Sequence, residues 1–224
     1  MSQDYIQKVT VRGSNPLCDD ILMYDNFEGR LNWAGSGTGT DWVVAQSSGG
    51  NEMIDGLYGL KLQTRTTTPA AGNWVTAIRY MGQLPGRILR YFVYFRPVGV
   101  NGCSSVDFGF YLYNGQTVTY VIVSYFVGDH TWKYYTPSGT WVAIPGMSMV
   151  YDPNAWSYLE FLYDVDTNML CGGRSGQMAS PVLSLLQCQA PSTVAPAVAA
   201  RFTLTTSGPA SQVFYYDHVM LSVV

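Results

Sequence analysis

The feature that most constrains this chain is a series of short runs of strand-forming residues, separated by turn signals and without any long helical period. Ile88–Phe95 is a nearly continuous apolar and aromatic run, and Leu57–Thr66 alternates apolar with polar residues. Val106–Tyr113 and Thr117–Phe126 flank Asn114-Gly115, two residues that tolerate the positive φ of a type I′ turn. These runs predict an all-β chain built from antiparallel hairpins.

Further runs extend this pattern to the C-terminus. Pro137-Ser138-Gly139 predicts a second hairpin between two short strand-forming runs. Gln189–Ala200 is rich in Pro and Ala, and we interpret it as a connecting loop. The remaining expected strands are Thr131–Tyr135, Thr140–Ile144, Trp156–Tyr163, Arg201–Thr206 and Gln212–Val223. Many short strands with almost no helix favour a β-sandwich or jelly roll.

The length and composition fit a single domain. The chain has 224 residues, of which 47% are hydrophobic, enough for one sizeable core. No internal repeat or break in composition divides it. We expect an extended N-terminal arm over residues 1–22, held by the domain itself or by a neighbouring subunit, and one domain over residues 23–224.

Three segments carry a resemblance to a known superfamily. Tyr24-Asp25-Asn26-Phe27-Glu28 is followed by Trp33, Trp156–Asn168 reads as a strand and an acidic turn, and Phe214–Leu221 closes the chain. Together they resemble concanavalin A-like and laminin-G-like lectin jelly rolls over residues 24–224. The resemblance implies an antiparallel jelly-roll β-sandwich, and it implies the fold far more than an activity.

The same resemblance implies a structural calcium where the first and last strands pair, with Glu28 and Asp217 as ligands. His218 stands where a second acid would be, which removes one oxygen ligand. The alternative is that Asp217 hydrogen-bonds a neighbouring loop and ties the last strand to the Phe27-Glu28 region. Asp164–Asn168 has the D-x-D-x-N opening of a calcium loop, but Met169 replaces the required glycine, so we interpret it as a turn. We expect no other cofactor.

The charge pattern excludes several classes of partner. Charged residues make up only 12% of the chain, the net charge is −3, and the twelve basic residues are scattered, so we expect no nucleic-acid partner. No run reaches the roughly 18 to 20 apolar residues that span a membrane. The N-terminus has no apolar h-region, so we expect no secretion signal.

The four cysteines, Cys18, Cys103, Cys171 and Cys188, show no paired spacing, and we expect all four to be reduced.

No catalytic signature is present, so we predict a non-enzymatic protein without catalytic residues. The E-x-D-x-x-E pattern of glucanases is absent, and Glu160 and Asp164 form only a weak pair of acids on one face of a strand. Neither His130 nor His218 lies near a G-x-S-x-G nucleophile elbow.

Two non-enzymatic functions remain. The first is a virion component, such as a phage decoration, cement or tail-associated subunit, and the low charge, the arm and the missing signal favour it. Its partners would be other virion subunits, as a homo-oligomer, and its location the virion or, alternatively, the cytoplasm. The second is a lectin-like module that stacks glycans on tyrosines. If Phe108 and Phe110 point inward, then Tyr111 and Tyr113 point outward, and Tyr120 or Tyr125 joins them across the hairpin; these four are the candidate glycan- or partner-binding residues.

Overall fold

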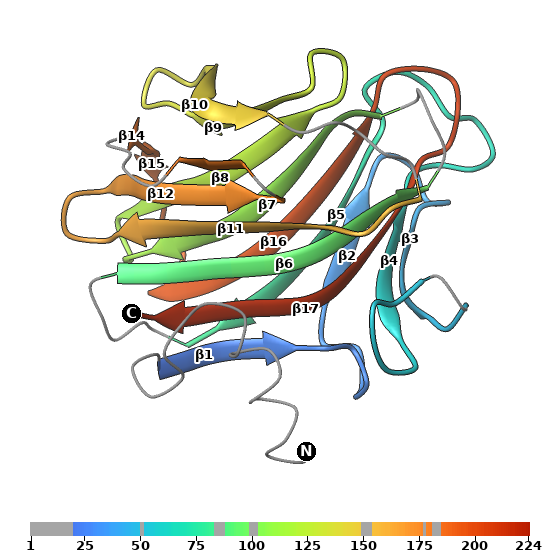
Figure 1. Ribbon diagram of the computed structural model, residues 1–224, viewed down its shortest axis with the longest axis horizontal. Helices are drawn as coiled ribbons and strands as arrows, with labels where there is room; N and C mark the ends of the chain where they lie inside the picture. Colours follow the sequence, from blue (N-terminus) through green and yellow to red (C-terminus); the bar gives the residue numbers. More distant parts are fainter. Residues whose placement is uncertain are drawn as a thin grey trace.

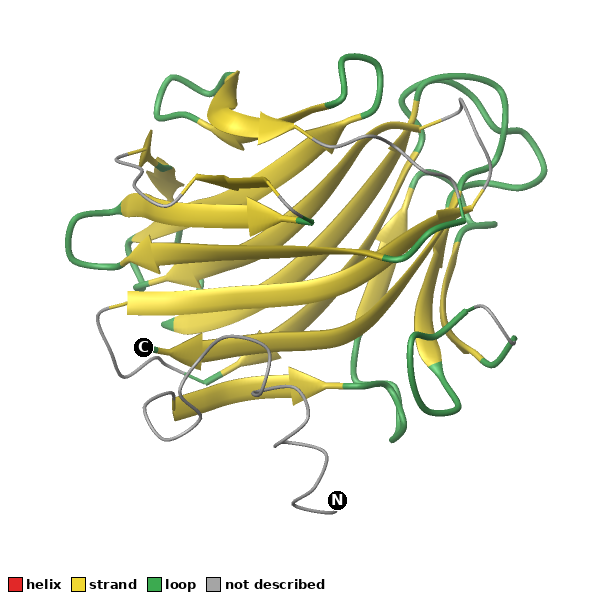
Figure 2. Cartoon of the chain, in the orientation of Figure 1, coloured by secondary structure: helices red, strands yellow, loops and turns green. Residues whose placement is uncertain are grey.

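The computed structural model is a β-sandwich of two sheets, and it describes residues 20–49, 52–82, 88–98, 103–148, 154–176, 178–180 and 185–224. Within these ranges all strand pairs are antiparallel and no helix is present (Figure 2). Consequently, the described part of the chain also contains no helix that is long and apolar enough to cross a membrane. The all-β, antiparallel jelly-roll class is therefore confirmed.

The first sheet has its two longest strands, β6 and β17, at its centre (Figure 1). Its order is β13 (Met178–Ser180), β12 (Met169–Ser175), β11 (Ser157–Asp164), β6 (Ile88–Val98), β17 (Val213–Val223), β4 (Gly59–Gln63) and β3 (Val43–Ser47), with β1 (Asp20–Asp25) beside β17 and β14 (Leu185–Leu186) beside β12.

The second sheet lies behind the first in Figure 1 and carries the two predicted hairpins. Its order is β10 (Trp141–Ser148), β9 (Thr131–Tyr135), β8 (Thr117–Phe126), β7 (Cys103–Tyr113), β16 (Ala197–Thr206), β5 (Trp74–Met81) and β2 (Ala34–Gly37), with β15 (Cys188–Pro191) beside β8.

The core lies between the sheets and is rich in aromatic rings. The alternation along β6 and β7 turns Tyr91, Phe95 and Phe108 inward, where all three are fully or almost fully buried. Phe202 of β16 stacks on Tyr216 of β17, with ring centroids 4.3 Å apart, and so joins the two sheets. Since each large ring removes about 150–250 Å² of surface from water, these inter-sheet contacts hold the two layers together.

One expectation about the chain organisation needs correction, and the last residues of the expected arm are held by the domain itself. Gln189–Ala200, expected to be a loop, contributes to β15 and to the beginning of β16. Its residues in β16 are small and fit between β5 and β7. Residues 20–22, assigned to the arm, belong to β1, which pairs with β17 over Asp20–Asp25. Residues 1–19 of the expected arm lie outside the described residues. Of the cysteines, Cys103, Cys171 and Cys188 are free thiols, and Cys18 is likewise outside the described part.

Candidate functional site

The outer face of the second sheet brings together polar and aromatic side chains from four neighbouring strands. The register places Tyr80, Ala199, Tyr111 and Tyr120 in one row across β5, β16, β7 and β8. Two residues further along each strand, Ile78, Arg201, Gly109 and Ile122 form the next row. A third row consists of Thr76, Thr203, Asp107 and Ser124. Side chains two residues apart on a strand share a face, so the three rows form one surface.

Arg201 is at the centre of this surface and links its aromatic and polar parts. Its guanidinium lies over the Tyr111 ring, 4.9 Å from the centroid. Its Nε donates to Thr203 Oγ1 at 3.0 Å and its Nη2 donates to Thr76 Oγ1 at 3.4 Å. Gly109 is its neighbour on β7, and a side chain there would collide with the Val121 carbonyl oxygen of β8. These contacts fix the orientation of Arg201, and no further hydrogen bond from its guanidinium is found within the described part of the chain.

Asp107 is the acidic partner of this centre. Ser124 Oγ donates to Asp107 Oδ1 at 2.6 Å. Burial raises the pKa of Asp107 to about 6, although the Ser124 hydrogen bond and the charge of Arg201 both act in the opposite direction. Burial likewise lowers the pKa of Arg201, against the attraction of Asp107. A carboxylate and a guanidinium therefore lie close together on a face that no other strand covers within the described part of the chain.

A continuous row of aromatic rings borders the polar centre, and we call it the aromatic row. Successive ring centroids along it lie 4.9 to 6.5 Å apart, which is the range of favourable aromatic contacts. Tyr80 at one end is the most exposed member, with 58% of its surface accessible. In order, the row consists of Tyr80, Tyr113, Tyr111, Tyr120, Tyr135, Trp141 and Phe126.

The structure brings together three of the four predicted tyrosines. Tyr111, Tyr113 and Tyr120 belong to the aromatic row. Tyr125 does not, because it is opposite Val106, an inward residue, and only 1% of its surface is exposed. It contacts Trp132 in the core, with centroids 5.2 Å apart, and its hydroxyl is 3.0 Å from His130 Nδ1. The assignment of Tyr125 to a binding surface is therefore wrong, since residues 120 and 125 differ by an odd number and face opposite sides.

Several residues of the surface were missed at the sequence level. Asp107 and Arg201 were not recognised, because the pairing of β7 with β16 brings them together across 94 residues of chain. Tyr80, Tyr135 and Trp141 were also not predicted. Strand alternation would have placed Tyr135 outward once Trp132 was known to be inward, whereas nothing in the local sequence places β5 beside β16.

The closing strand contains the other acid of interest, Asp217, at a bulge. Pairing of β17 with β6 breaks between Asp217 and Met220, and His218 has a φ of 48°. Asp217 is fully buried and accepts three backbone N–H groups: Ile54 at 2.9 Å and Asp55 at 3.4 Å on Oδ2, and His218 at 2.8 Å on Oδ1. This confirms the interpretation that Asp217 binds a neighbouring loop.

Burial shifts both side chains of the Asp217-His218 pair toward their neutral forms. It raises the pKa of Asp217 to about 7, against the hydrogen bonds from Ile54, His218 and Asp55. It lowers the pKa of His218, whose Nδ1 lies 2.6 Å from the Tyr24 hydroxyl of β1. Since an unprotonated imidazole nitrogen can accept a hydrogen bond from a hydroxyl, Tyr24 and His218 join the first strand to the last.

Glu28 binds the same loop as Asp217. Its Oε1 accepts the backbone N–H groups of Leu57 at 2.6 Å and Tyr58 at 2.9 Å. Calcium requires six to eight oxygen ligands, and the oxygens of Glu28 and Asp217 that face the loop already accept amides. In the described ranges, no three His, Cys, Asp or Glu side chains gather as a metal site would require. The arrangement of these residues does not fit a calcium ion. The predicted calcium site at Glu28 and Asp217 is therefore not supported by these contacts.

The acids and histidines considered for catalysis have structural partners. Glu160 Oε2 accepts from Arg174 Nη2 at 2.6 Å. Asp164 Oδ1 accepts the backbone N–H groups of Asp166 at 2.9 Å and Thr167 at 3.3 Å, which confirms the predicted turn. His130 has a φ of 55°, as expected for a turn residue.

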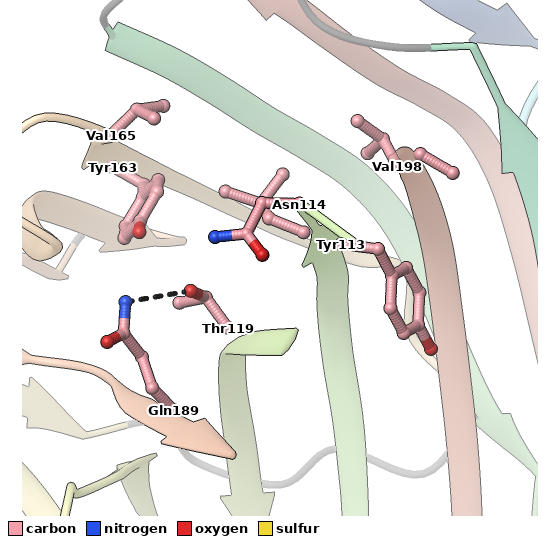
Figure 3. A pocket seen from close by; sticks show the side chains of 9 residues that line it. Tyr113, Asn114, Thr119, Tyr163, Val165, Gln189 and Val198 are labelled. Carbon is pink, nitrogen blue, oxygen red and sulfur yellow. Dashed lines mark hydrogen bonds between the residues drawn. The ribbon is translucent and has the colours of Figure 1, made fainter. Parts of the chain in front are cut away.

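A pocket opens at the edge of the sandwich beside the Asn114-Gly115 hairpin (Figure 3). Its volume is about 210 Å³, and Tyr163 and Val165 from the first sheet's side face Thr119 and Gln189 from the second. Tyr113 also lines it, so the pocket adjoins the aromatic row.

Solved structures share the fold. A carbohydrate esterase of the Shiga toxin-encoding bacteriophage phi24B superposes with a TM-score of 0.55 at 16% identity, covering 92% of this chain and 99% of its own. A protein of unknown function from Shewanella oneidensis MR-1 gives 0.52 at 13%, covering 99% and 94%. The cellulose-induced protein Cip1 gives 0.50 at 11%, covering 90% and 97%.

These likenesses show the fold. They confirm the resemblance to lectin-type jelly rolls at the level of architecture, because identities this low carry nothing about activity. No family model matches the sequence, and no curated protein matches it.

Proposed function

We propose that this protein is a non-catalytic carbohydrate-binding jelly roll, and that the outer face of its second sheet binds a glycan. The observation that carries the proposal is the aromatic row beside the Arg201–Asp107 centre. Pyranose rings present an apolar C–H face that stacks on aromatic side chains, and their hydroxyls bind charged groups strongly. The row supplies the stacking surface and the centre supplies one donor fork and one acceptor carboxylate.

The two charges of the centre favour a neutral glycan. Arg201 and Asp107 have opposite charges and lie close enough to shift one another's pKa. An acidic glycan that bound Arg201 would be repelled by Asp107 when that carboxylate is ionised. Neutral hydroxyl pairs use both groups without this repulsion, so we expect hexose or pentose polymers as ligands.

A glycan array followed by calorimetric titration tests the proposal. Binding of a neutral oligosaccharide should weaken about tenfold in Tyr80→Ala and in Tyr120→Ala, equivalent to about 1.4 kcal/mol each. Tyr58→Ala is the matched control, because Tyr58 is an exposed tyrosine outside the aromatic row. Equal affinities for all three variants, or no array signal for the unsubstituted chain, would contradict glycan binding on this face.

A second candidate is a virion component, namely a phage decoration, cement or tail-associated subunit that forms a homo-oligomer. The observation that supports it is the same largely aromatic face, which would equally suit a neighbouring subunit, together with a fold shared with a protein of bacteriophage phi24B. Light scattering on the full chain and on a chain beginning at residue 20, which keeps β1 intact, tests it. An oligomer that the truncation dissociates would support assembly through residues 1–19, and a monomer in both cases would refute it.

A further inference from the structure

The pocket at the hairpin edge has unused hydrogen-bonding groups at its mouth. Asn114 Oδ1 accepts the backbone N–H groups of Gln116 at 2.9 Å and Thr117 at 2.7 Å, which leaves its amide nitrogen without a partner in the described part of the chain. Gln189 Nε2 donates to Thr119 Oγ1 at 3.1 Å, as Figure 3 shows. Among the described residues, the other end of this amide, Oε1, has no hydrogen-bond donor. One donor and one acceptor therefore stand beside the opening.

The floor and walls of the pocket combine apolar and polar side chains. Tyr163 and Thr119 are almost completely buried, and the Tyr163 hydroxyl donates to Asn168 Oδ1 at 2.8 Å and also interacts with the Thr119 side chain. Leu112, Val165 and Val198 supply apolar walls. This combination of apolar walls with a few placed polar groups is typical of small-molecule sites.

The charge and size of the pocket limit what it can hold. None of its nine described lining residues is Asp, Glu, Lys, Arg or His, so an ion would lose its hydration without gaining an opposite charge. Its volume of about 210 Å³ far exceeds the need of one water and is smaller than typical drug-sized sites. A neutral ligand about the size of one sugar ring meets both limits.

The position of Tyr113 connects the pocket to the aromatic row. Tyr113 lines the pocket, and its ring lies 6.3 Å from Tyr111 and 6.5 Å from Tyr80. The pocket and the aromatic row therefore meet at Tyr113.

We propose that this pocket binds the terminal unit of a neutral glycan, so that the protein recognises chain ends as well as chain interiors. Asn114 Nδ2 donates to one ring hydroxyl and Gln189 Oε1 accepts from another, while the apolar walls contact the C–H face. The inference rests on the proposed glycan binding for the identity of its ligand, but it concerns a separate set of side chains.

Amide chemical-shift titration of the full chain with methyl glycosides of glucose, galactose and xylose tests it, with glucuronate as the charged comparison. A neutral glycoside should give saturable shifts at Asn114–Thr117 and Gln189 in the millimolar range, and glucuronate should give none. Asn114→Asp should weaken this binding at least about fivefold, because it keeps the Oδ1 acceptor of the turn but removes the donor. Gln116→Glu adds the same charge to the same hairpin without touching the pocket and should leave the affinity unchanged.

The outcomes separate this inference from the proposed function. Shifts confined to the aromatic row and the Arg201 region, with none at the hairpin, would overturn the terminal-unit site and leave the proposed function standing. Hairpin shifts that persist unchanged in Asn114→Asp would also overturn it. Saturable hairpin shifts that survive Tyr120→Ala but not Asn114→Asp would establish the pocket even if the outer face bound no longer glycan.

Discussion

Asp217 and Asp107 make an instructive comparison, because both are strand aspartates whose pKa is raised by burial, to about 7 and about 6. Asp217 accepts three backbone N–H groups, from Ile54, Asp55 and His218. Asp107 accepts a hydrogen bond from Ser124 on Oδ1, and in the described part of the chain its other oxygen has no donor. An acid in a strand is thus structural when backbone amides occupy its oxygens, and it is available to a ligand when they do not.

The surroundings of the two acids explain this difference. Asp217 sits at a bulge in the centre of the first sheet, where the Ile54–Tyr58 loop covers it and delivers its amide groups. Asp107 sits on the outer face of the second sheet beside Arg201, and no strand or sheet covers that face within the described ranges. The first environment closes the fold, and the second holds a half-buried carboxylate beside a half-buried guanidinium on a sheet face.

The largest effect should come from removing the structural acid. We expect Asp217→Ala to lower the free energy of unfolding by about 2–4 kcal/mol, because it leaves buried amide donors unpaired. Asp107→Ala should cost clearly less, since only the Ser124 hydrogen bond is lost. Urea unfolding of both variants measures the difference. Equal losses would break the distinction between the two acids.

The pH dependence of stability should separate them next. A raised pKa means that the folded state binds the proton more tightly, so stability falls as pH rises from the ordinary value of 3.8 to the folded value. For Asp217 this window extends to about pH 7, and for Asp107 to about pH 6.

Asn substitutions test these windows in unfolding curves at several pH values. Asp217→Asn should remove the decline that the unsubstituted protein shows between pH 6 and 7, whereas Asp107→Asn should preserve it. If the free energy of unfolding of Asp217→Asn still declined between pH 6 and 7, the decline would belong to another titrating group.

A third effect concerns ligand binding alone. Arg201→Lys should weaken glycan binding about tenfold, because a lysine lacks the planar fork that is held over Tyr111 by Thr203 and Thr76. Its thermal unfolding should change little, since the side chain is on the outer face. Calorimetric titration with the best array ligand and a melting curve provide the two measurements. A large drop in melting temperature without a loss of affinity would show that Arg201 stabilises the fold rather than binds the glycan.

The smallest effect should distinguish the two kinds of tyrosine on β8. Tyr125→Phe removes an inward hydroxyl that meets His130 and should cost about 1 kcal/mol of stability without altering glycan binding. Tyr120→Phe keeps the stacking ring on the outer face and should change neither quantity by a measurable amount. A loss of glycan binding in Tyr125→Phe would restore Tyr125 to the binding surface.

Local sequence was sufficient to predict much of the architecture. The Asn114-Gly115 signal predicted the hairpin of β7 and β8, the Tyr113 end of β7 and both ends of β8. β7 begins at Cys103 rather than Val106, and the turn is centred on Gly115 and Gln116, since Asn114 N donates to Thr117 O. The alternation of Phe108, Phe110 and Tyr111 also predicted which tyrosines of β7 face outward. By contrast, β2 has the sequence Ala-Gly-Ser-Gly, which has low strand propensity, and only its pairing with β5 makes it a strand.

What the sequence by itself determined is therefore everything set by neighbours along the chain: the strand class, the hairpins, the Asp164 turn and the outward position of Tyr111. What only the tertiary structure decided is which distant strands meet. The pairing of β16 with β7 places Arg201 beside Asp107, and the packing of the Ile54–Tyr58 loop on β17 gives Asp217 its amide donors. Such contacts depend on the burial of whole faces rather than on local propensity, so no short stretch of sequence encodes them.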